Sequence, residues 1–350
     1  MADRQMVFRA AVIGLGFIGA ADQVSGDAIG QQVRNLDGTH AQALQAHPRV
    51  ELVAGSSRDE GRRERFSERT GCRNTYADWR EMLAAEQLDI VSIATNSPHH
   101  AEITIACAAA GVRAVLCEKP ITTRLSDADR AIEACKQHGT VLAINHLRRW
   151  NPMWITVRDE LASGAIGDIE HLTAHWTSGR LGNIGTHVFD ACRMLLGADP
   201  VAVSGRLGPV VPPDCRGPQF RDPGGWGIVE FSGGVKGYVH AAAEARAPIR
   251  VCIVGSEGQL TVRRDEARVE LWSGQRREIP VKTDRPTSLE LAVRDLVDCI
   301  SHGTQPACTG EDGRAALEVT IGFHVSDRLN GAWIPLPISG DDRHYEVQIG

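Results

Sequence analysis

The sequence predicts an α/β protein whose N-terminal part forms a doubly wound parallel sheet. Two observations support this fold class. Through the first 145 residues, short apolar runs of strand length alternate with helical patterns. The first of these runs, Ala10 to Ile13, leads directly into a glycine-rich stretch from Gly14 to Gly19. A strand, a tight glycine turn and a helix in this order are typical of a βαβ unit.

The glycine-rich stretch reads Gly14-Leu-Gly-Phe-Ile-Gly19. Gly14 permits a tight turn, Gly16 lets the backbone approach a phosphate, and Gly19 lets the helix pack closely on the strand. The helix N-terminus then offers N–H groups to a pyrophosphate. A plain glycine turn after a buried strand is the alternative, but the βα units that follow favour a dinucleotide site. We expect the dinucleotide at Gly14, Gly16, Phe17, Ile18 and Gly19.

Composition limits the class of protein. The chain has 350 residues, 42% of them hydrophobic, and at this size it more readily forms two domains than one. Its formal charge of −6 gives no electrostatic basis for binding nucleic acid or an anionic membrane. The absence of a membrane-spanning apolar run and of a signal-peptide pattern predicts a soluble cytoplasmic protein. The nine cysteines form no Cys-x-x-Cys pair, and no histidine has partners at ligand spacing, so we expect reduced thiols and no metal site.

The end of the second strand, Val50 to Gly55, indicates which dinucleotide binds. An acidic side chain there would bind the ribose hydroxyls of NAD, but Ser57 and Arg58 occupy this position. A carboxylate repels a 2′-phosphate, whereas a hydroxyl and a guanidinium can bind it. The sequence therefore predicts that Ser57 and Arg58 bind NADP, with NAD as the alternative. Arg62 and Arg63 either add to this pocket or are solvated on a helix.

The chain between the glycine turn and the second strand is too long for an ordinary βαβ unit. We interpret residues 20 to 38 as an insertion, after which Thr39 can cap a helix that runs to Pro48. One hypothesis is that the insertion covers the cofactor or reaches a neighbouring subunit. The other is a passive surface loop, and the sequence leaves both open.

Three further strands place polar segments at the carboxyl edge of the predicted sheet, where ligands bind in such folds. The segments are Thr95 to His100, Glu118 to Pro120, and Asn145 to Arg149. The strands that precede them are Leu88 to Thr95, Arg113 to Cys117 and Val141 to Asn145, and the helices between them are Glu102 to Ala110 and Asp127 to His138.

The second half of the chain reads mainly as strands, broken by Gly-Gly, Ser-Gly or Pro turns. Residues 208 to 225 are expected to form a long irregular connection near a substrate mouth. Two helices, Ser288 to Ile300 and Gly313 to Leu329, follow the strands. The expected strands are Ile169 to Thr177, Val201 to Leu207, Trp226 to Phe231, Val235 to Ala241, Ile249 to Val254, Gln259 to Val262 and Val269 to Trp272.

Six motifs occur in order along the chain: Gly14 to Gly19, Cys117 to Pro120, Arg148 to Pro152, Gly164 to Gly167, Gly185 to His187 and Gly255 to Gly258. Together they resemble the glucose-fructose oxidoreductase/inositol dehydrogenase (Gfo/Idh/MocA) family. The resemblance implies a Rossmann domain over residues 1–145 and, over residues 146–350, an α/β domain with a large, mostly antiparallel open sheet. It also implies that the second domain carries the substrate site and builds homodimers or homotetramers. The implied reaction oxidises or reduces a carbinol carbon of a sugar, sugar derivative or cyclitol.

Hydride transfer from an alcohol needs a group that takes the hydroxyl proton and a group that stabilises the developing alkoxide. Lys119, at a strand end between Glu118 and Pro120, can direct an ammonium at that oxygen. His187 has an ordinary pKa near ~6.5 that suits proton transfer near neutrality. The resemblance implies catalytic roles for Lys119 and His187.

The chain departs from the family pattern at Asn183, where the family often has aspartate. If both lie on one helix, Asn183 shares a face with His187 and can bind substrate hydroxyls, but it supplies no negative charge. We expect Arg148 to flank the nicotinamide or the substrate. Arg149 and Trp150 belong either to the site or to an interface, and His146 is a weaker candidate. The residues expected to line the cofactor are Thr95, Asn96, His100, Glu118, Lys119 and Arg148, whereas His99 faces either the site or solvent.

Two other functions remain open at this stage. One is a related enzyme that uses bound NAD transiently to cleave a glycoside or eliminate a substituent. The other is a cofactor-sensing regulator without turnover, which the presence of both Lys119 and His187 disfavours.

Overall fold

The computed structural model describes residues 6–24, 38–177, 179–210, 217–241, 248–263, 266–280 and 286–350. Contacts divide the chain into two compact units. The first comprises Met1–Thr122, Asp127–Leu147 and Pro286–Glu311, and the second comprises Thr123–Ser126, Arg148–Arg285 and Asp312–Gly350. The first unit thus includes residues 286–311, whereas the domain boundary predicted from the sequence, at residue 145, assigns them to the second domain. The functional boundary between domains stays a prediction.

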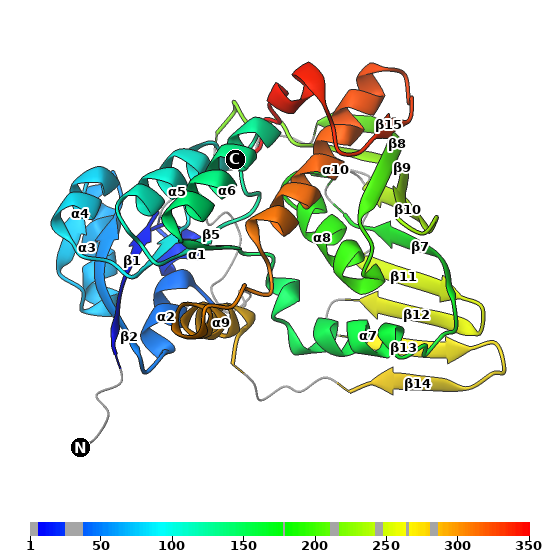
Figure 1. Ribbon diagram of the computed structural model, residues 1–350, viewed down its shortest axis with the longest axis horizontal. Coiled ribbons are helices and arrows are strands. Elements are labelled where there is room, and N and C mark those ends of the chain that lie inside the picture. Colours follow the sequence, from blue (N-terminus) through cyan, green and yellow to red (C-terminus); the bar gives the residue numbers. More distant parts are fainter. Residues whose placement is uncertain are drawn as a thin grey trace. The chain divides into compact units, whose positions relative to one another are not determined.

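A six-stranded sheet forms the centre of the first unit (Figure 1). Its order is β3-β2-β1-β4-β5-β6, and every neighbouring pair is parallel. The strand order reverses at β1, beside β4, which creates the switch point where ligands bind in doubly wound sheets. The predicted parallel sheet is confirmed, although β3 was not predicted. The strands are β1 Phe8–Ile13, β2 Val50–Ser56, β3 Asn74–Tyr76, β4 Ile90–Ile93, β5 Ala114–Cys117 and β6 Val141–Ile144.

The helix after β1 is split into two pieces, α1 (Phe17–Ala20) and α2 (His40–Ala46). Ala21, with φ of 58°, ends α1 in the left-handed region. Thr39 begins α2, because its side chain accepts a hydrogen bond from the Gln42 N–H. The predicted helix after Thr39 is therefore confirmed. Residues 25–37 of the predicted insertion lie outside the described residues, and both hypotheses about its role stay open.

The remaining helices of the first unit pack on its sheet and on one another. Helix α9, far along the chain, lies beside α2 and also contacts β5 and β6 (Figure 1). Thr287 and Glu290 form a capping box that fixes its start. The helices are α3 Glu60–Thr70, α4 Trp79–Ala85, α5 His100–Ala109, α6 Leu125–His138 and α9 Ser288–His302, with the short 3₁₀ turns η3 Ser97–His99 and η4 Leu147–Arg149.

The second unit contains a nine-stranded sheet in the order β14-β13-β12-β11-β7-β10-β9-β8-β15. Its pairs are antiparallel except for β7 with β10, so the expected mostly antiparallel sheet is confirmed. Strands β14 and β15 were not predicted. The strands are β7 Ile169–His175, β8 Pro200–Val210, β9 Pro223–Phe231, β10 Lys236–Ala241, β11 Arg250–Gly255, β12 Gly258–Arg263, β13 Glu266–Leu271, β14 Arg276–Ile279 and β15 Ile334–Pro335.

The expected irregular connection over residues 208 to 225 is wrong at both ends. Strand β8 continues to Val210 and pairs there with Pro223, the first residue of β9. The glycines in this ladder do not break it, because they fit a close contact with the helix above. A Cβ on Gly205 would lie 2.5 Å from the Phe323 ring of α10 (Gly310–Arg328), and one on Gly227 would lie 2.8 Å from the same ring. Residues 211–216 lie outside the described part of the chain.

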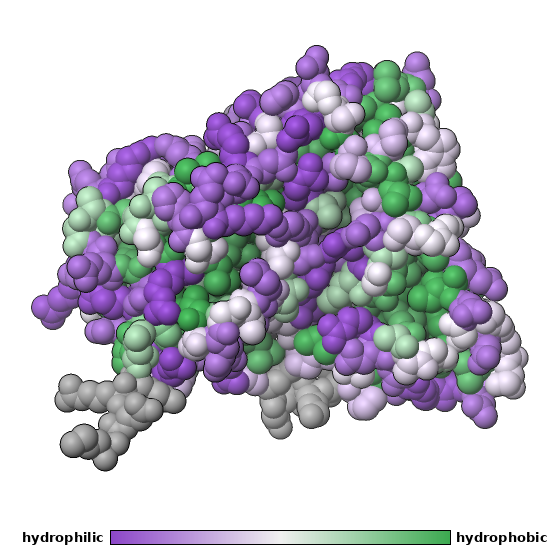
Figure 2. All heavy atoms as spheres, viewed as in Figure 1, coloured by the Kyte–Doolittle hydropathy of each residue, from purple (hydrophilic) through white to green (hydrophobic). Residues whose placement is uncertain are grey.

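Helices α7 (Pro152–Ala162), α8 (Gly185–Leu196) and α10 (Gly310–Arg328) lie on one face of this sheet (Figure 1). Residues along β10 alternate between exposed and buried, as expected for a sheet with one covered face. Trp226 and Tyr238 lie on the open face and are 57% and 45% exposed. Figure 2 shows hydrophobic residues in green among hydrophilic residues in purple on the side of the molecule that it draws. The open face therefore offers aromatic side chains to solvent.

Within the described residues, every helix is too short or too polar to cross a lipid bilayer. No set of three or more His, Cys, Asp or Glu side chains in this part of the chain is arranged to hold a metal ion. The eight described cysteines are buried and unbridged.

Candidate active site

The glycine turn after β1 has the close contacts that only glycine allows. Gly14 has φ of 98°, and a Cβ there would lie 2.4 Å from the Ala94 oxygen. A Cβ on Gly19 would lie 1.9 Å from the Gly14 oxygen. Gly16 is the N-cap of α1 and provides no side-chain acceptor for the first N–H groups of the helix. The turn therefore combines tight packing with polar backbone groups at a helix start, as a pyrophosphate site requires.

This turn opens onto a cavity of about 300 Å³ at the switch point of the first sheet. The cavity is lined by the ends of β1 and β2, by the segments that follow β3 and β4, and by parts of α3, α4 and α5. Six of the residues predicted to bind the cofactor line it, namely Gly14, Gly16, Ser57, Arg58, Thr95 and Asn96. Ile13, Ser56, Arg62, Ala77, Trp79, Arg80, Ala94, His99, Glu102 and Ile103 complete the lining.

Three guanidinium groups line the cavity, but their electrostatic surroundings differ. The Arg62 Nε atom lies 3.5 Å from Oδ2 of the fully buried Asp22. Arg80 forms an ion pair with Glu102. Among the described residues, Arg58 has no carboxylate within ion-pair distance. Arg58 is therefore the guanidinium in this cavity whose charge is not offset by a carboxylate nearby.

Arg63 has a different role from its neighbour Arg62. Its Nη1 atom donates to the Ser57 oxygen at 2.7 Å and to the Arg58 oxygen at 3.1 Å. Arg63 therefore braces the backbone of the segment that carries the predicted phosphate ligands.

Trp79 and Arg80, at the start of α4, also line the cavity but were not predicted from the sequence. The Arg80 guanidinium lies over the Trp79 ring, 4.1 Å from its centroid. The signal that could have found them is the short strand β3, because a loop after a parallel strand lies at the ligand edge of the sheet. The three-residue strand Asn74–Tyr76 was too short to be recognised from its pattern.

The two adjacent histidines at the start of α5 lie in different places. His99 lines the cavity. His100 is fully buried, with Nδ1 2.8 Å from the Pro120 oxygen and Nε2 3.0 Å from the Thr95 oxygen. The position of His100 therefore does not support the predicted contact with the cofactor, and His99 occupies the position expected for it. Burial lowers the pKa of the His100 ring.

The loop after β5 carries Glu118, Lys119 and Pro120, and its Lys119–Pro120 peptide bond is cis. Glu118 is buried, and its Oε1 atom lies 3.0 Å from His40 Nε2 and 2.6 Å from Asn145 Nδ2. The Lys119 backbone N–H donates to Glu118 Oε2 at 3.3 Å. Burial alone would raise the pKa of Glu118, but the His40 hydrogen bond, the charges of His40 and Lys119, and the Asn145 hydrogen bond lower it to about 2.

The predicted residues Asn183 and His187 belong to the second unit. His187 is half-buried in the first turn of α8, whereas Asn183 lies in the turn before this helix. The expectation that both lie on one helix is therefore wrong. The reason is Asp222, a buried carboxylate that accepts from the Gly182 N–H at 2.7 Å and the Asn183 N–H at 2.6 Å. These bonds hold the chain in a turn.

Arg148 lies beside a separate cavity of about 370 Å³ in the second unit, which Trp154, Thr177, Pro248 and Ile249 also line. Its guanidinium is 5.1 Å from the centre of the Trp154 ring. Burial lowers the pKa of Arg148 to about 10, against the opposing effect of Asp190. The structure thus places Arg148 and His187 in one unit and Lys119 in the other.

The residues next to Arg148 are largely buried, and the alternatives of a role in the site or in an interface stay predictions. Arg149 donates to both carboxylate oxygens of the fully buried Asp190, at 2.8 and 3.1 Å, and lies 3.1 Å from Asp312. Trp150 is only 4% exposed and His146 is fully buried. These side chains stabilise the fold, and none of them lines a cavity described above.

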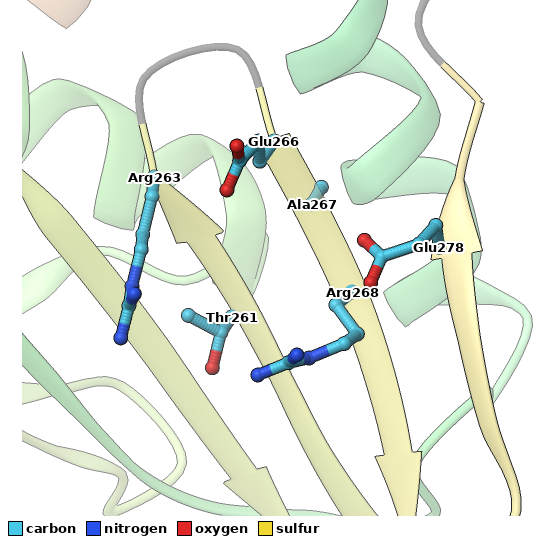
Figure 3. Close-up of a pocket in the computed structure, with 6 residues that line it drawn as sticks. All are labelled: Thr261, Arg263, Glu266, Ala267, Arg268 and Glu278. Carbon is cyan, nitrogen blue, oxygen red and sulfur yellow. The ribbon is translucent and has the colours of Figure 1, made fainter.

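A third cavity of about 60 Å³ lies on strands β12, β13 and β14 (Figure 3). Thr261, Arg263, Ala267, Arg268 and two glutamates line it. The side chains mix both signs of charge, and no residue predicted to act in the site is among them. We therefore place the candidate site at the switch point of the first sheet.

A doubly wound sheet, a glycine turn and a cavity at the switch point are typical of a dinucleotide-binding domain. Comparison with family models agrees. Residues 8–146 match the oxidoreductase family with an NAD-binding Rossmann fold, and residues 154–261 match the Gfo/Idh/MocA C-terminal domain. The chain belongs to the Gfo/Idh/MocA family and is an NAD(P)-binding oxidoreductase.

Named relatives cover the chain to different extents. A D-apiose dehydrogenase from Paraburkholderia graminis is 34% identical over 160 residues, which are 46% of this chain and 38% of that protein. The NAD⁺-dependent scyllo-inositol 2-dehydrogenase of Bacillus subtilis is 25% identical over 94% of this chain and 96% of its own. A levoglucosan dehydrogenase solved with NADH and levoglucosan shares the fold, with a TM-score of 0.80 at 23% identity, covering 95% of this chain and 100% of that one.

Proposed function

We propose that the protein transfers a hydride between NADP and a hydroxyl-bearing carbon of a sugar, sugar derivative or cyclitol. The observation that carries this proposal is the presence, within one unit, of a cavity at the glycine turn and of a lysine on a loop anchored by a buried carboxylate. The substrates in the relatives' names, an aldose, an inositol and an anhydrosugar, support the polyhydroxylated substrate class.

The residues of this chain have separate tasks in the proposed reaction. When bound, the nicotinamide accepts or supplies the hydride. Lys119 holds an ammonium against the reacting oxygen and stabilises its developing negative charge. His187 exchanges the hydroxyl proton, and Asn183 and Arg148 bind the remaining polar groups of the substrate. Each of these roles is a proposal from motif and position.

The preference for NADP rests on the charge at the end of β2. Arg58 lines the cavity with no carboxylate of the described residues within ion-pair distance, and Ser57 offers a hydroxyl beside it. A 2′-phosphate would receive charge-assisted hydrogen bonds from these groups. Among the relatives, one name and one structure title refer to NAD⁺ or NADH, whereas the name of a D-xylose 1-dehydrogenase refers to NADP⁺, so NAD is the alternative that the titration below must reject.

We also propose that the chain forms a homodimer or homotetramer through the open face of its nine-stranded sheet. The exposed Trp226 and Tyr238 support this, because aromatic side chains are enriched in subunit interfaces. The cytoplasmic location stays a prediction from the sequence.

The test of the proposed function is the formation of reduced nicotinamide from NADP and from NAD with a pooled panel of sugars, sugar acids, glycosides and inositols. We expect a signal that favours NADP and disappears in Lys119→Ala. Binding of both cofactors without turnover of any substrate would reject the proposal. That outcome would favour transient oxidation in glycoside cleavage, or a cofactor-sensing regulator, and glycoside hydrolysis by the same samples separates the two.

A further inference from the structure

A buried histidine outside the predicted site contacts the loop that carries Lys119. His40 is the first residue of α2 and is fully buried. Its Nε2 atom lies 3.0 Å from Glu118 Oε1, on the residue that precedes Lys119. We propose that His40 is a positioning residue that holds Lys119 through the Glu118 carboxylate. This inference rests on the proposed role of Lys119.

The two oxygens of Glu118 have different partners, which fixes the orientation of its carboxylate. Oε1 accepts from His40 and from Asn145 Nδ2, the latter at 2.6 Å. Oε2 accepts from the Lys119 backbone N–H at 3.3 Å. Because two donors from separate elements hold Oε1, the second oxygen is directed at the Lys119 backbone. The direction in which the lysine leaves the loop therefore depends on both donors.

The hydrogen bonds of His40 are directed at Glu118 alone. Among the described residues, its Nδ1 atom is buried and has no hydrogen-bond partner. The Oδ1 atom of Asn145 is likewise buried without a partner in the described part of the chain. Both side chains thus direct their hydrogen bonding to one carboxylate rather than to a wider network.

The other side of Lys119 is held independently. The Pro120 oxygen lies 2.8 Å from Nδ1 of the buried His100. The loop is therefore anchored on the residues before and after the lysine. Loss of His40 should release only the Glu118 side, so we expect a displaced lysine rather than an unfolded loop.

Helix α2 gives His40 a rigid support. The helix begins with the Thr39 cap and packs against β2 and α9. His40 therefore approaches Glu118 from a packed helix. An ordinary core histidine in this place would affect stability without affecting the lysine, and this difference makes the proposal testable.

The small number of lysines permits a direct readout. The chain has four, Lys119, Lys136, Lys236 and Lys282. Reductive methylation with ¹³C-formaldehyde keeps their charge and gives one NMR signal for each, and Lys119→Arg assigns the signal of interest. The variants are His40→Leu, which removes the donor, and His40→Gln, which keeps an N–H donor. His138→Gln is the control, because His138 is exposed at the end of α6.

We expect the Lys119 signal to shift by more than its linewidth in His40→Leu, to return toward the wild-type position in His40→Gln, and to stay unchanged in His138→Gln. With a turned-over substrate, kcat of His40→Leu should fall by about 10- to 100-fold, the range for loss of a hydrogen bond to a charged group. The KM for the cofactor should not change.

A folded His40→Leu variant with an unmoved Lys119 signal would overturn the proposal. If His40→Leu does not fold, His40→Asn, whose amide is too short to reach Glu118, takes its place. The NMR readout needs no substrate. A shifted signal without turnover of any substrate would therefore reject the proposed function and keep this inference, and turnover without a shift would do the reverse.

Discussion

Each unit contains a deeply buried carboxylate, and the two have different surroundings. In the first unit Glu118 lies on the loop after β5, and its partners are His40, Asn145 and the Lys119 backbone. In the second unit Asp190 lies inside α8 and is bound by Arg149. The partners of Glu118 carry at most one side-chain charge among them, whereas Asp190 faces a full guanidinium.

The difference shows where each unit uses a buried charge. Arg149 also contacts Asp312, and Arg193 pairs with Asp312 and with Asp199, so Asp190 belongs to an extended ion network. Such a network holds helices and loops in place. Glu118 instead lies at the carboxyl edge of a sheet, where ligands bind. We infer that the first arrangement serves the reaction and the second serves the fold, and the following experiments test this contrast.

The largest expected effect is on turnover. Lys119→Ala should lower kcat by about 100- to 10,000-fold, the range for removing a group that acts on the transition state, because no other ammonium on this loop can replace it. Cofactor affinity and the free energy of unfolding should stay near their wild-type values. Steady-state kinetics and calorimetric titration check both. Lys136→Ala is the matched control, since Lys136 is exposed and pairs with Glu311; a loss of activity in that variant would argue against a specific role for Lys119.

The second experiment concerns Asp190 in the second unit, where we expect a loss of stability. Asp190→Ala leaves the Arg149 guanidinium without its main partner and should lower the free energy of unfolding by about 3 to 5 kcal/mol. Urea denaturation measures this loss. Asp159→Ala, which removes a carboxylate that is 61% exposed, should change stability by less than about 0.5 kcal/mol. Equal stabilities of the two variants would contradict the assignment of Asp190 to the fold.

Titratable groups in the two units should reduce the stability of the folded state in different ranges of acidic pH. Burial lowers the pKa of His324, in α10, to about 4, so the folded state disfavours its charged form. An unfolded histidine has a pKa of about 6.5, and between these values the unfolded state binds more protons. Stability contributed by this group is therefore present above pH ~6.5 and lost as the pH falls toward ~4, by roughly 3 kcal/mol at most. Glu118 responds in the same direction but at lower pH: its pKa is lowered to about 2, so the stability that it contributes is lost as the pH falls from its ordinary pKa of ~4.3 toward about 2.

Unfolding of the wild type and of His324→Phe at several pH values measures this contrast. The phenyl ring can replace the tilted contact of His324 with Tyr345, whose rings are 5.5 Å apart. We expect His324→Phe to lose less stability than the wild type between neutral pH and pH ~4. If the free energy of unfolding of the two proteins depended on pH in the same way, another group would control the loss of stability in acid.

The smallest of these effects concerns cofactor choice. Arg58→Ala should weaken NADP binding by about 10- to 100-fold and leave NAD binding unchanged, because only the 2′-phosphate loses a charge-assisted hydrogen bond. Calorimetric titration with both cofactors measures it. Arg73→Ala, an exposed arginine away from the cavity, serves as the control. An equal loss of affinity for NADP and NAD would contradict this prediction. It would indicate that Arg58 binds the pyrophosphate, which both cofactors share.

The first unit was more predictable from the sequence than the second. Strands β4 and β5 are buried along their whole length, and the glycine turn requires glycine for steric reasons, so both leave a local pattern. The second sheet was recognised, but β14, which is mostly exposed and charged, and the two-residue β15 have no such pattern. Their pairing depends on contacts between distant parts of the chain.

The candidate site, too, could be predicted from the sequence only where residues follow a predicted strand. Gly14, Ser57, Arg58 and Thr95 could be placed because each follows a strand that the sequence predicts. His40 could not, because its partner Glu118 is 78 residues away and nothing in the helix pattern of α2 marks the contact. The turn at Asn183 was likewise hidden, since it depends on the distant Asp222.

The most direct test of the proposed reaction follows the hydrogen atom itself. The panel compounds that reduce the cofactor would be prepared with deuterium on their carbon atoms, and the reduced cofactor would be analysed by mass spectrometry. We predict that NADPH formed by the wild type gains one deuterium and that Lys119→Ala forms almost none. Reduced cofactor that carries no deuterium would contradict hydride transfer from a carbinol carbon.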